Sequence, residues 1–221
     1  TYVNYESNIK LQKKQKCEGR WEVVINKEQL AQMMKRAASL WLQNCDELSA
    51  IDSKFGDGDH GITVKKIALF MEQQIPLMDE KPLDDFFHDL GWGIMGLSGG
   101  SAGPLYGTMI SGLGIPLKGK DAIDAQSLKA MLQSSLAEMQ DITTAKVGDK
   151  TMMDSLIPAA EAAQSAADDN AEILQAMSDA AVKGAEESRG YISKFGRAKS
   201  YKEATIGTPD AGAVSTSLFF R

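Results

Sequence analysis

The stretch Ile51-Asp52-Ser53-Lys54-Phe55-Gly56-Asp57-Gly58-Asp59-His60-Gly61-Ile62-Thr63 places three carboxylates and a histidine among three glycines. Carboxylates this close repel one another, so a chain that keeps them together needs a compensating positive charge. Oxygen ligands favour Mg²⁺ or Ca²⁺ over zinc. A helix that begins just past Gly61 would also direct free N–H groups at an anion held by such cations. The stretch therefore predicts a metal-bridged phosphate site.

The acidic loop, residues 52–59, has two other interpretations. Asp and Gly are common turn residues, so a plain polar turn followed by a helix cap is an alternative that stays open. A calcium-binding EF-hand loop fails in both registers. Counting from Asp57 places Ala68 where the twelfth-position Glu belongs, and counting from Asp52 places Lys54 at the third position. The failed count favours Mg²⁺ over Ca²⁺.

Composition and charge limit the class of protein. The 221 residues, 43% of them hydrophobic, suffice for one large domain or two small ones with a substantial core. A net charge of −6 and a pI near 5.0 argue against nucleic acid as the main partner. No apolar run or signal-like segment indicates a membrane, so we expect a cytoplasmic protein. The two cysteines indicate neither a disulfide framework nor a thiolate zinc site.

Apolar residues at helical spacing predict an all-α fold, because no stretch alternates with period two for long enough to indicate a strand. We expect residues 1–20, which are rich in lysine, to be a flexible N-terminal extension or a leader left by cloning, and residues 21–221 to form one domain. Asn26, with Gln29 three residues later, predicts the start of a helix that runs into the acidic loop. Further helices are predicted around residues 64–71, 86–97, 104–113, 128–136, 151–167, 170–188 and 213–221.

Two glycine patterns match nucleotide motifs in spacing but not in context. Residues 91–96 fit the dinucleotide fingerprint, yet a helical pattern precedes them and no strand-helix-strand unit surrounds them. We interpret this match as chance. Residues 207–212 have the spacing of a Walker loop, but Ala213 and Val214 stand where Lys and Ser or Thr are required.

Three other polar segments suit an anion better. Residues 97–108 combine small residues with Pro104 at a helix start, which lets the backbone approach a phosphate. Residues 146–154 and 196–200 bring cations or hydroxyls to helix ends. Arg197 offers planar, bidentate donors for a phosphate. A tight helix connection and a surface arginine are the structural alternatives for these segments.

Taken in order, the acidic loop, Gly99-Gly100-Ser101, Gly148-Asp149-Lys150-Thr151-Met152, Gly196-Arg197-Ala198 and Ile206–Ala213 resemble one family. The chain is similar, over residues 28–221, to the L subunit or C-terminal nucleotide-binding domain of dihydroxyacetone kinases. This resemblance implies a closed barrel of eight antiparallel amphipathic helices, with ADP or ATP and two Mg²⁺ ions at one rim. It also implies that Asp52, Asp57 and Asp59 are the metal ligands.

The resemblance further implies the nucleotide contacts, with Arg197 as the candidate catalytic residue. These contacts fall on His60, Gly61, Ile62, Thr63, Ser101, Ala102, Thr143, Met152, Arg197, Asp210, Ala211 and Gly212. The chain departs from the family pattern at Thr63, where some members have Asn, at Ala102, which replaces a common Ser, and at Ala211, which replaces a Pro.

The family's activity implies a phosphoryl-donating kinase subunit. We expect the acceptor sugar to be held by a separate K-type subunit, without which this chain would be inactive, and a phosphotransferase-system protein could recharge a retained ADP. Two alternatives remain open. The same fold could report nucleotide state to a regulatory protein partner, or the chain could be a Mg²⁺-dependent phosphatase or a kinase for another small sugar.

Overall fold

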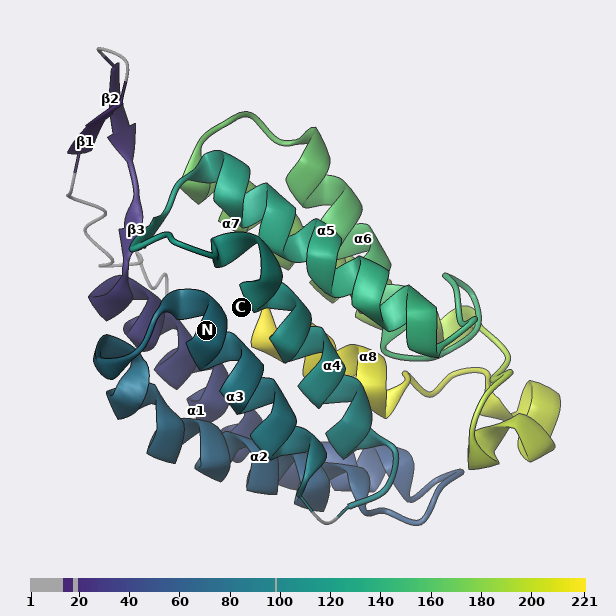
Figure 1. The fold of residues 1–221 in the computed structure, drawn as a ribbon. Helices are drawn as coiled ribbons and strands as arrows, with labels where there is room; N and C mark the ends of the chain where they lie inside the picture. The colour runs from purple at the N-terminus through teal and green to yellow at the C-terminus, as the bar shows by residue number, and fades with distance from the viewer. Residues whose placement is uncertain (1–13, 18–19, 98) are drawn as a thin grey trace, which may run out of the picture.

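Helices make up most of the computed structural model, which describes residues 14–17, 20–97 and 99–221 (Figure 1). The sequence predicted an all-α fold, and over these residues the fold is mostly helical, with little sheet. The α-helices are α1 Lys27–Asp52, α2 His60–Gln74, α3 Leu83–Met95, α4 Ala102–Gly114, α5 Ala125–Ile142, α6 Met153–Ser165, α7 Asn170–Glu187 and α8 Ala211–Phe219. Short 3₁₀ helices lie in the connections at Ile75–Glu80, Ile115–Leu117, Ser188–Gly190 and Arg197–Thr205.

Side-chain caps fix where several helices begin. The Asn26 side chain accepts a hydrogen bond from Gln29 N at 2.9 Å, and the Gln29 side chain accepts one from Asn26 N at 3.0 Å. This reciprocal capping box satisfies two N–H groups that the helix itself cannot bond, and it confirms the predicted start of α1. The Asp124 side chain caps α5 by accepting a hydrogen bond from Ser127 N, and the Asp169 side chain caps α7 by accepting from Ala171 N and Glu172 N.

Short strands are present, although the sequence pattern predicted none. β1 (Lys14–Cys17) pairs with β2 (Arg20–Val23), and β3 (Ile25–Asn26) pairs with β4 (Ala122–Ile123), both antiparallel. The expectation of no strand was wrong because elements of two to four residues are too short to show an alternating pattern. The first hairpin crosses the boundary expected at residue 21, while residues 1–13 and 18–19 of the predicted extension lie outside the described residues.

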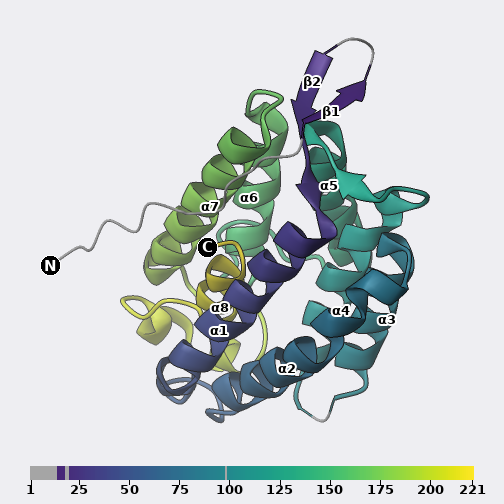
Figure 2. The ribbon, with the colours of Figure 1, turned by 90° about the vertical axis from the view of Figure 1, so that its left-hand side faces the viewer.

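The helices pack mainly on their sequence neighbours, and α8 joins the two ends of the chain. α1 packs on α2, α3 on α4, α4 on α5, and α6 on α7. The C-terminal helix α8 packs against α1, α6 and α7, as Figure 2 shows for the yellow helix. None of the helices in the described part of the chain is long and apolar enough to cross a membrane.

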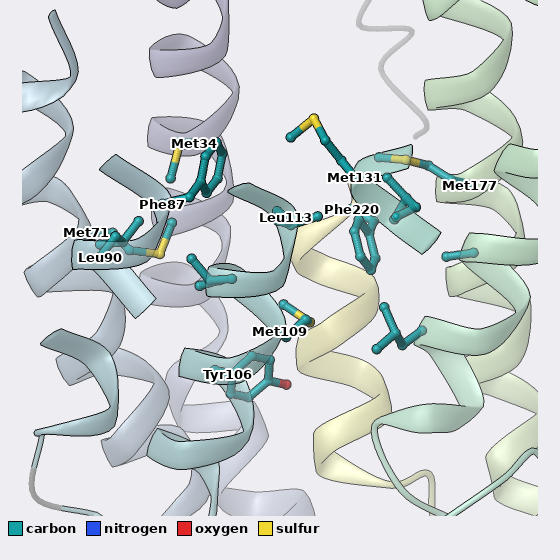
Figure 3. Close-up of a cluster of buried hydrophobic side chains, with 14 of the residues drawn as sticks. Met34, Met71, Phe87, Leu90, Tyr106, Met109, Leu113, Met131, Met177 and Phe220 are labelled. Carbon is teal, nitrogen blue, oxygen red and sulfur yellow. The ribbon is translucent and has the colours of Figure 1, made fainter. Parts of the chain in front are cut away.

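Methionine and aromatic side chains fill the interior between the helices (Figure 3). Met71 and Met109 are fully buried, and the Trp41 and Tyr106 rings meet edge to face with centroids 5.1 Å apart. Unbranched methionine adapts to irregular gaps, and each fully buried side chain of this size contributes about 1.5–3 kcal/mol. The core therefore joins side chains from several helices into one hydrophobic cluster.

The glycine pattern at residues 91–96 has a packing role. It begins within α3, without a strand before it, so its interpretation as a chance match to the dinucleotide fingerprint is confirmed. A methyl group added at Gly91 would lie 2.6 Å from the carbonyl oxygen of Gly107, and one added at Gly107 would lie 2.6 Å from that of Gly91. These two glycines allow α3 and α4 to approach backbone to backbone.

Candidate functional site

A cavity of about 320 Å³ opens at the end of the molecule where α1 finishes and α2, α4, α6 and α8 begin. Its lining comes from loops that are distant in sequence. The lining residues are Asp52, Gly56, Asp57, Asp59, His60, Gly100, Ser101, Ala102, Leu105, Tyr106, Lys150, Thr151, Met152, Ser193, Phe195, Gly196, Arg197, Ala198, Asp210, Ala211 and Gly212.

Four helices present their N-terminal ends to this cavity. His60, Ala102 and Ala211 are the first residues of α2, α4 and α8, and Met152 immediately precedes α6. The first N–H groups of a helix lack partners within it and carry a partial positive charge. Four such ends around one cavity favour an anionic ligand, as phosphate-binding sites do.

The acidic loop forms one wall. Asp52 ends α1, and the ligand oxygens of Asp52, Asp57 and Asp59 all lie within 4.8 Å of one another. Burial, reinforced by the charges of Asp57 and Asp52, raises the pKa of Asp59. Three clustered carboxylates that repel one another are a donor set suited to a hard cation. These residues therefore fit the Mg²⁺ that the sequence predicts.

Arg197 reaches this wall from the 3₁₀ segment Arg197–Thr205. Its guanidinium forms an ion pair with Asp57. Burial would raise the pKa of Asp57, but a hydrogen bond from its own backbone N–H and the charge of Arg197 hold that pKa below its ordinary value. The Arg197 side chain is 70% exposed and thus free to turn toward a ligand. The Tyr201 ring also lies against Phe55, with centroids 5.2 Å apart, so the segment covers the acidic loop.

The His60 side chain is half-buried at the cavity and hydrogen-bonded toward the interior of the protein. Its Nε2 lies 2.8 Å from the hydroxyl of Ser215, which in turn lies 2.6 Å from the hydroxyl of Tyr106. Burial lowers the pKa of His60 to about 4, against an opposing effect of Asp52, so the imidazole is neutral at pH 7. This network ties the start of α2 to α4 and α8, and supports a structural rather than a sugar-binding role for His60.

The opposite wall contains Met152, Lys150 and the turn before α8. The Asp210 carboxylate accepts a hydrogen bond from Ala213 N at 2.8 Å and caps α8. Burial raises the pKa of Asp210 to about 7. The hydrogen bond from the Ala213 N–H opposes this rise, the charge of Asp154 adds to it, and the charge of Lys150 opposes it. Residue-by-residue prediction missed Lys150 and Tyr106. Lys150 was noted only as part of the polar segment 146–154. No local sequence pattern marks a tyrosine, such as Tyr106, that will be buried at a site.

The structure brings most of the predicted residues together. All three predicted metal ligands line the cavity. The predicted nucleotide-contacting residues that also line it are His60, Ser101, Ala102, Met152, Arg197, Asp210, Ala211 and Gly212.

Four predicted nucleotide contacts do not line this cavity and remain predictions. Gly61 faces α1, where an added methyl group would lie 1.8 Å from the carbonyl oxygen of Cys45. Ile62 is 56% exposed, whereas Thr63 is buried and packs against Gly99. The Thr143 hydroxyl, at the end of α5, accepts a hydrogen bond from Ala145 N at 3.2 Å. Helix geometry explains the first three, since consecutive residues of α2 must face different sides.

Comparison with known proteins shows the family of this chain. The family model of the DAK2 domain matches residues 54–221. The chain belongs to the DAK2 domain family. This DAK2 chain is 32% identical, over 200 residues, to a Listeria innocua protein named "PEP-dependent dihydroxyacetone kinase 2, ADP-binding subunit DhaL", covering 88% of this chain and 92% of that one. The resemblance to this family expected from the sequence is confirmed.

Larger proteins contain a similar region. The DAK2 chain is 30% identical over 201 residues to human triokinase/FMN cyclase, covering 88% of this chain but 34% of that one. A crystal structure of the dihydroxyacetone kinase from C. freundii in complex with AMP-PNP and Mg²⁺ superposes with a TM-score of 0.66 and 22% identity, over 100% of this chain and 36% of that one. The DAK2 chain thus spans nearly all of the Listeria subunit and about a third of the human enzyme.

Proposed function

We propose that this chain is the nucleotide-binding, phosphoryl-donating subunit of a kinase for dihydroxyacetone or a related small ketose. The observation that carries the proposal is a single cavity in which three clustered carboxylates face Arg197 and four helix N-termini. Phosphoryl transfer depends on positioning and charge neutralisation more than on a covalent nucleophile. The name of the Listeria relative, an ADP-binding subunit, supports this choice.

The residues divide the work by chemistry. Asp52, Asp57 and Asp59 would hold two Mg²⁺ ions, which when bound supply positive charge against the phosphates. Arg197 would leave Asp57 and donate to the transferred phosphoryl group, because a guanidinium provides paired donors. The main-chain N–H groups at Ser101 and Ala102 would bond the phosphates. Met152 would offer an apolar contact for the base.

The acceptor sugar is proposed to bind to a separate K-type subunit. His60 is half-buried, neutral at pH 7 and bonded to Ser215, and the side chain of His88 lies on α3 beside Trp92, outside the cavity lining. Neither is therefore assigned to sugar binding. We also propose that α1–α8 close into a barrel, with the packing of α8 on α1 as the joining contact.

Isothermal titration of the isolated chain with ADP tests the nucleotide site. Wild-type protein is expected to bind ADP with MgCl₂ and to lose that binding in EDTA. Asp57→Asn removes one carboxylate charge from the cluster and is expected to abolish Mg²⁺-dependent binding. Unchanged ADP binding by Asp57→Asn would sink the proposal. Turnover of dihydroxyacetone only after a K-type subunit is added would support the division between subunits.

The source of the phosphoryl group is a separate question. Either ATP exchanges at the site, or a retained ADP is recharged by a phosphotransferase-system protein. Native mass spectrometry of gently purified protein distinguishes these modes, because a retained ADP adds its mass to the chain. A nucleotide-free spectrum, together with ATP binding by titration, favours exchange.

A further inference from the structure

Lys150 is a buried lysine to which the proposed chemistry gives no part. It is 4% exposed and lies in the connection between α5 and α6, at the cavity wall. Its φ angle is +61°, and in the described residues only Lys202 among the other non-glycine residues has a positive φ. This conformation is unfavourable for a residue that carries a side chain. The surrounding structure must therefore hold Lys150 in it.

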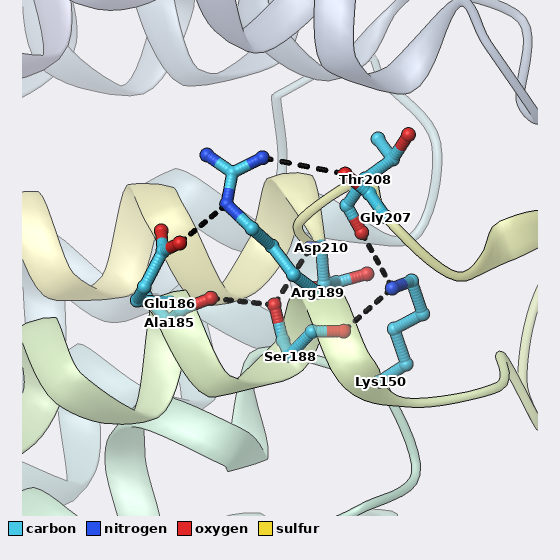
Figure 4. A network of polar contacts seen from close by, with 8 residues as sticks. All are labelled: Lys150, Ala185, Glu186, Ser188, Arg189, Gly207, Thr208 and Asp210. Atoms are coloured by element: carbon cyan, nitrogen blue, oxygen red, sulfur yellow. Dashed lines mark hydrogen bonds and ion pairs between the residues drawn. The ribbon is translucent and has the colours of Figure 1, made fainter.

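The Lys150 ammonium joins two turns that lie far from it in sequence (Figure 4). Nζ donates to the carbonyl oxygen of Ser188 and to that of Thr208, both at 2.5 Å. Burial lowers the pKa of Lys150, while the charges of Asp210 and Asp154 oppose this shift. Charge-assisted bonds in a buried setting are stronger than neutral ones. Removal of the ammonium would leave both carbonyls without this partner.

The two turns are also bonded to each other. Gly207 N donates to the carbonyl oxygen of Arg189 at 2.8 Å, and Asp210 N donates to the Ser188 hydroxyl at 2.9 Å. The Asp210 carboxylate then caps α8 at Ala213. A continuous set of contacts therefore runs from the Lys150 ammonium to the first turn of α8. We name the set formed by Lys150, Ser188, Thr208 and Asp210 the Lys150 clamp.

The connection that carries Lys150 is itself fixed. The fully buried Asp154 carboxylate accepts hydrogen bonds from Gly148 N and Thr151 N, both at 2.6 Å. These bonds flank Lys150 on both sides and hold its backbone in the left-handed conformation. The ammonium thus extends from a loop that is fixed by its own hydrogen bonds. It can therefore determine the positions of the Ser188 and Thr208 turns.

We propose that Lys150 is a positioning residue for the part of the cavity wall formed by Asp210, Ala211 and Gly212. Its ammonium holds the Ser188 and Thr208 turns together and so places these three residues against the cavity. This inference rests on the proposed nucleotide site. Lys150 acts through the turn and the α8 N-terminus, whereas no hydrogen bond or ion pair of the described residues joins the acidic loop to the clamp. Loss of Lys150 should therefore weaken nucleotide binding and leave cation binding intact.

Two variants test this role by titration. Lys150→Gly removes the side chain while accepting the positive φ, and Lys150→Met keeps most of the stem and removes the ammonium. Both are expected to bind ADP with MgCl₂ about tenfold or more weakly, the size of one lost charge-assisted bond, with Mg²⁺ affinity within about twofold of wild type. Lys146→Met is the control, because Lys146 is an exposed lysine of the same loop. Wild-type ADP affinity in both variants would overturn the proposal.

Chemical rescue separates positioning from general stability. n-Butylammonium replaces the atoms that Lys150→Gly lacks, and it is expected to restore most of the lost ADP affinity, whereas n-butanol at the same concentration is not. A loss of affinity that the amine does not reverse would assign Lys150 a merely structural role and contradict the proposal.

Hydrogen exchange tests the clamp without reference to nucleotide. In Lys150→Gly, the amides of Gly207, Asp210 and Ala213 are expected to exchange faster, with recovery in n-butylammonium, while the core amides of α1 keep their wild-type rates. If wild-type protein binds no ADP, the proposed function fails and this measurement alone decides the clamp. Unchanged exchange at all three amides would then refute it.

Discussion

The acidic loop and the Lys150 clamp face the same cavity, but their charges are balanced in different ways. In the loop, Asp52, Asp57 and Asp59 lie within 4.8 Å of one another, and Arg197 pairs with Asp57 from a largely exposed position. In the clamp, the buried ammonium of Lys150 bonds two carbonyls and lies near Asp210. The acidic loop is thus strongly negative, whereas the polar groups of the clamp are hydrogen-bonded to one another.

This difference indicates whether each wall of the cavity reaches its final arrangement before or during ligand binding. Mutual repulsion between carboxylates falls when a cation joins them, so the acidic loop gains stability on binding. The hydrogen bonds of the clamp form within the protein itself. The wall that contains the clamp is therefore ordered before a ligand binds, and little of the binding free energy is lost in ordering it. Substitutions in the two walls should therefore affect cation binding and nucleotide binding separately.

The largest effect that would sharpen this comparison is expected for Asp59→Asn. Burial, and then the charges of Asp57 and Asp52, raise the pKa of Asp59, so its ionised carboxylate is disfavoured without a cation. Its removal should weaken Mg²⁺ binding by about 100-fold or more, since even residues that only support metal ligands matter by about 10–100-fold. The cation-free protein should melt no lower than wild type, because repulsion is relieved. Titration calorimetry with MgCl₂ and thermal melts in EDTA measure the two effects.

Asp141→Asn is the matched control, because Asp141 is an exposed carboxylate on α5 outside the cavity lining. It should leave Mg²⁺ affinity unchanged. Mg²⁺ binding by Asp59→Asn at the wild-type level would show that the acidic loop is an ordinary turn, and the contrast between the two walls would then disappear.

Gly61→Ala tests the packing that supports the acidic loop. The added methyl group would lie 1.8 Å from the carbonyl oxygen of Cys45, where α2 crosses α1. Relieving such a clash requires the helices to separate, which costs about 1–3 kcal/mol and lowers the melting temperature by several degrees, at about 2–4 °C per kcal/mol. The acidic loop, which connects these two helices, should bind Mg²⁺ more weakly as a result.

Gly190→Ala provides the comparison near the clamp, because a methyl group there meets no atom within 4 Å. Its melting temperature and Mg²⁺ affinity should match wild type. If the two alanine variants melt at the same temperature, the close approach of α1 and α2 does not position the loop.

The two walls also differ in how far the sequence predicts them. The acidic loop is local, so its three carboxylates and their glycines were visible as a cluster, and the capping box at Asn26 and Gln29 marked the helix that leads to it. The Lys150 clamp depends on partners 38 and 58 residues away. No pattern along the chain reports such contacts, and Lys150 alone resembles any surface lysine.

The same reasoning accounts for the errors in the fold. β3 and β4 each have two residues and pair Ile25 with Ile123, so the signal is a long-range contact and not an alternating pattern.

At the start of α2, the family resemblance assigns nucleotide contacts to consecutive residues. The helix turns Gly61 toward α1 and Ile62 toward solvent. A contiguous motif therefore predicts the location of a site better than the direction of each side chain.

The smallest expected effect concerns pH and the clamp. The pKa of Asp210 is raised to about 7 in the folded protein, against about 3.9 for an unperturbed Asp. The folded state therefore binds more protons than the unfolded state between these values. By linkage, the Asp210 contribution to stability is fully present below the unfolded pKa and is lost as the pH rises through 7. Asp210→Asn, which cannot ionise, should remove this dependence.

Urea unfolding of wild type and Asp210→Asn at pH 5, 6, 7 and 8, without Mg²⁺ or nucleotide, measures the difference. The free energy of unfolding of wild type relative to the variant should fall by about 1 kcal/mol between pH 5 and pH 7, below the linkage limit of about 1.4 kcal/mol per pH unit, because Asp210 is partly exposed to the cavity and water screens its charge.

Asp124→Asn is the control with the opposite sign, since Asp124 also caps a helix. Burial alone would raise its pKa, but hydrogen bonds from Ser127 hold that pKa below the ordinary value. Asp124 is therefore ionised in both the folded and the unfolded states above pH 5, and its difference from wild type should stay constant from pH 5 to pH 8. Equal slopes for the two variants would mean that Asp210 is ionised throughout, and that the clamp wall meets the cavity as a carboxylate paired with Lys150.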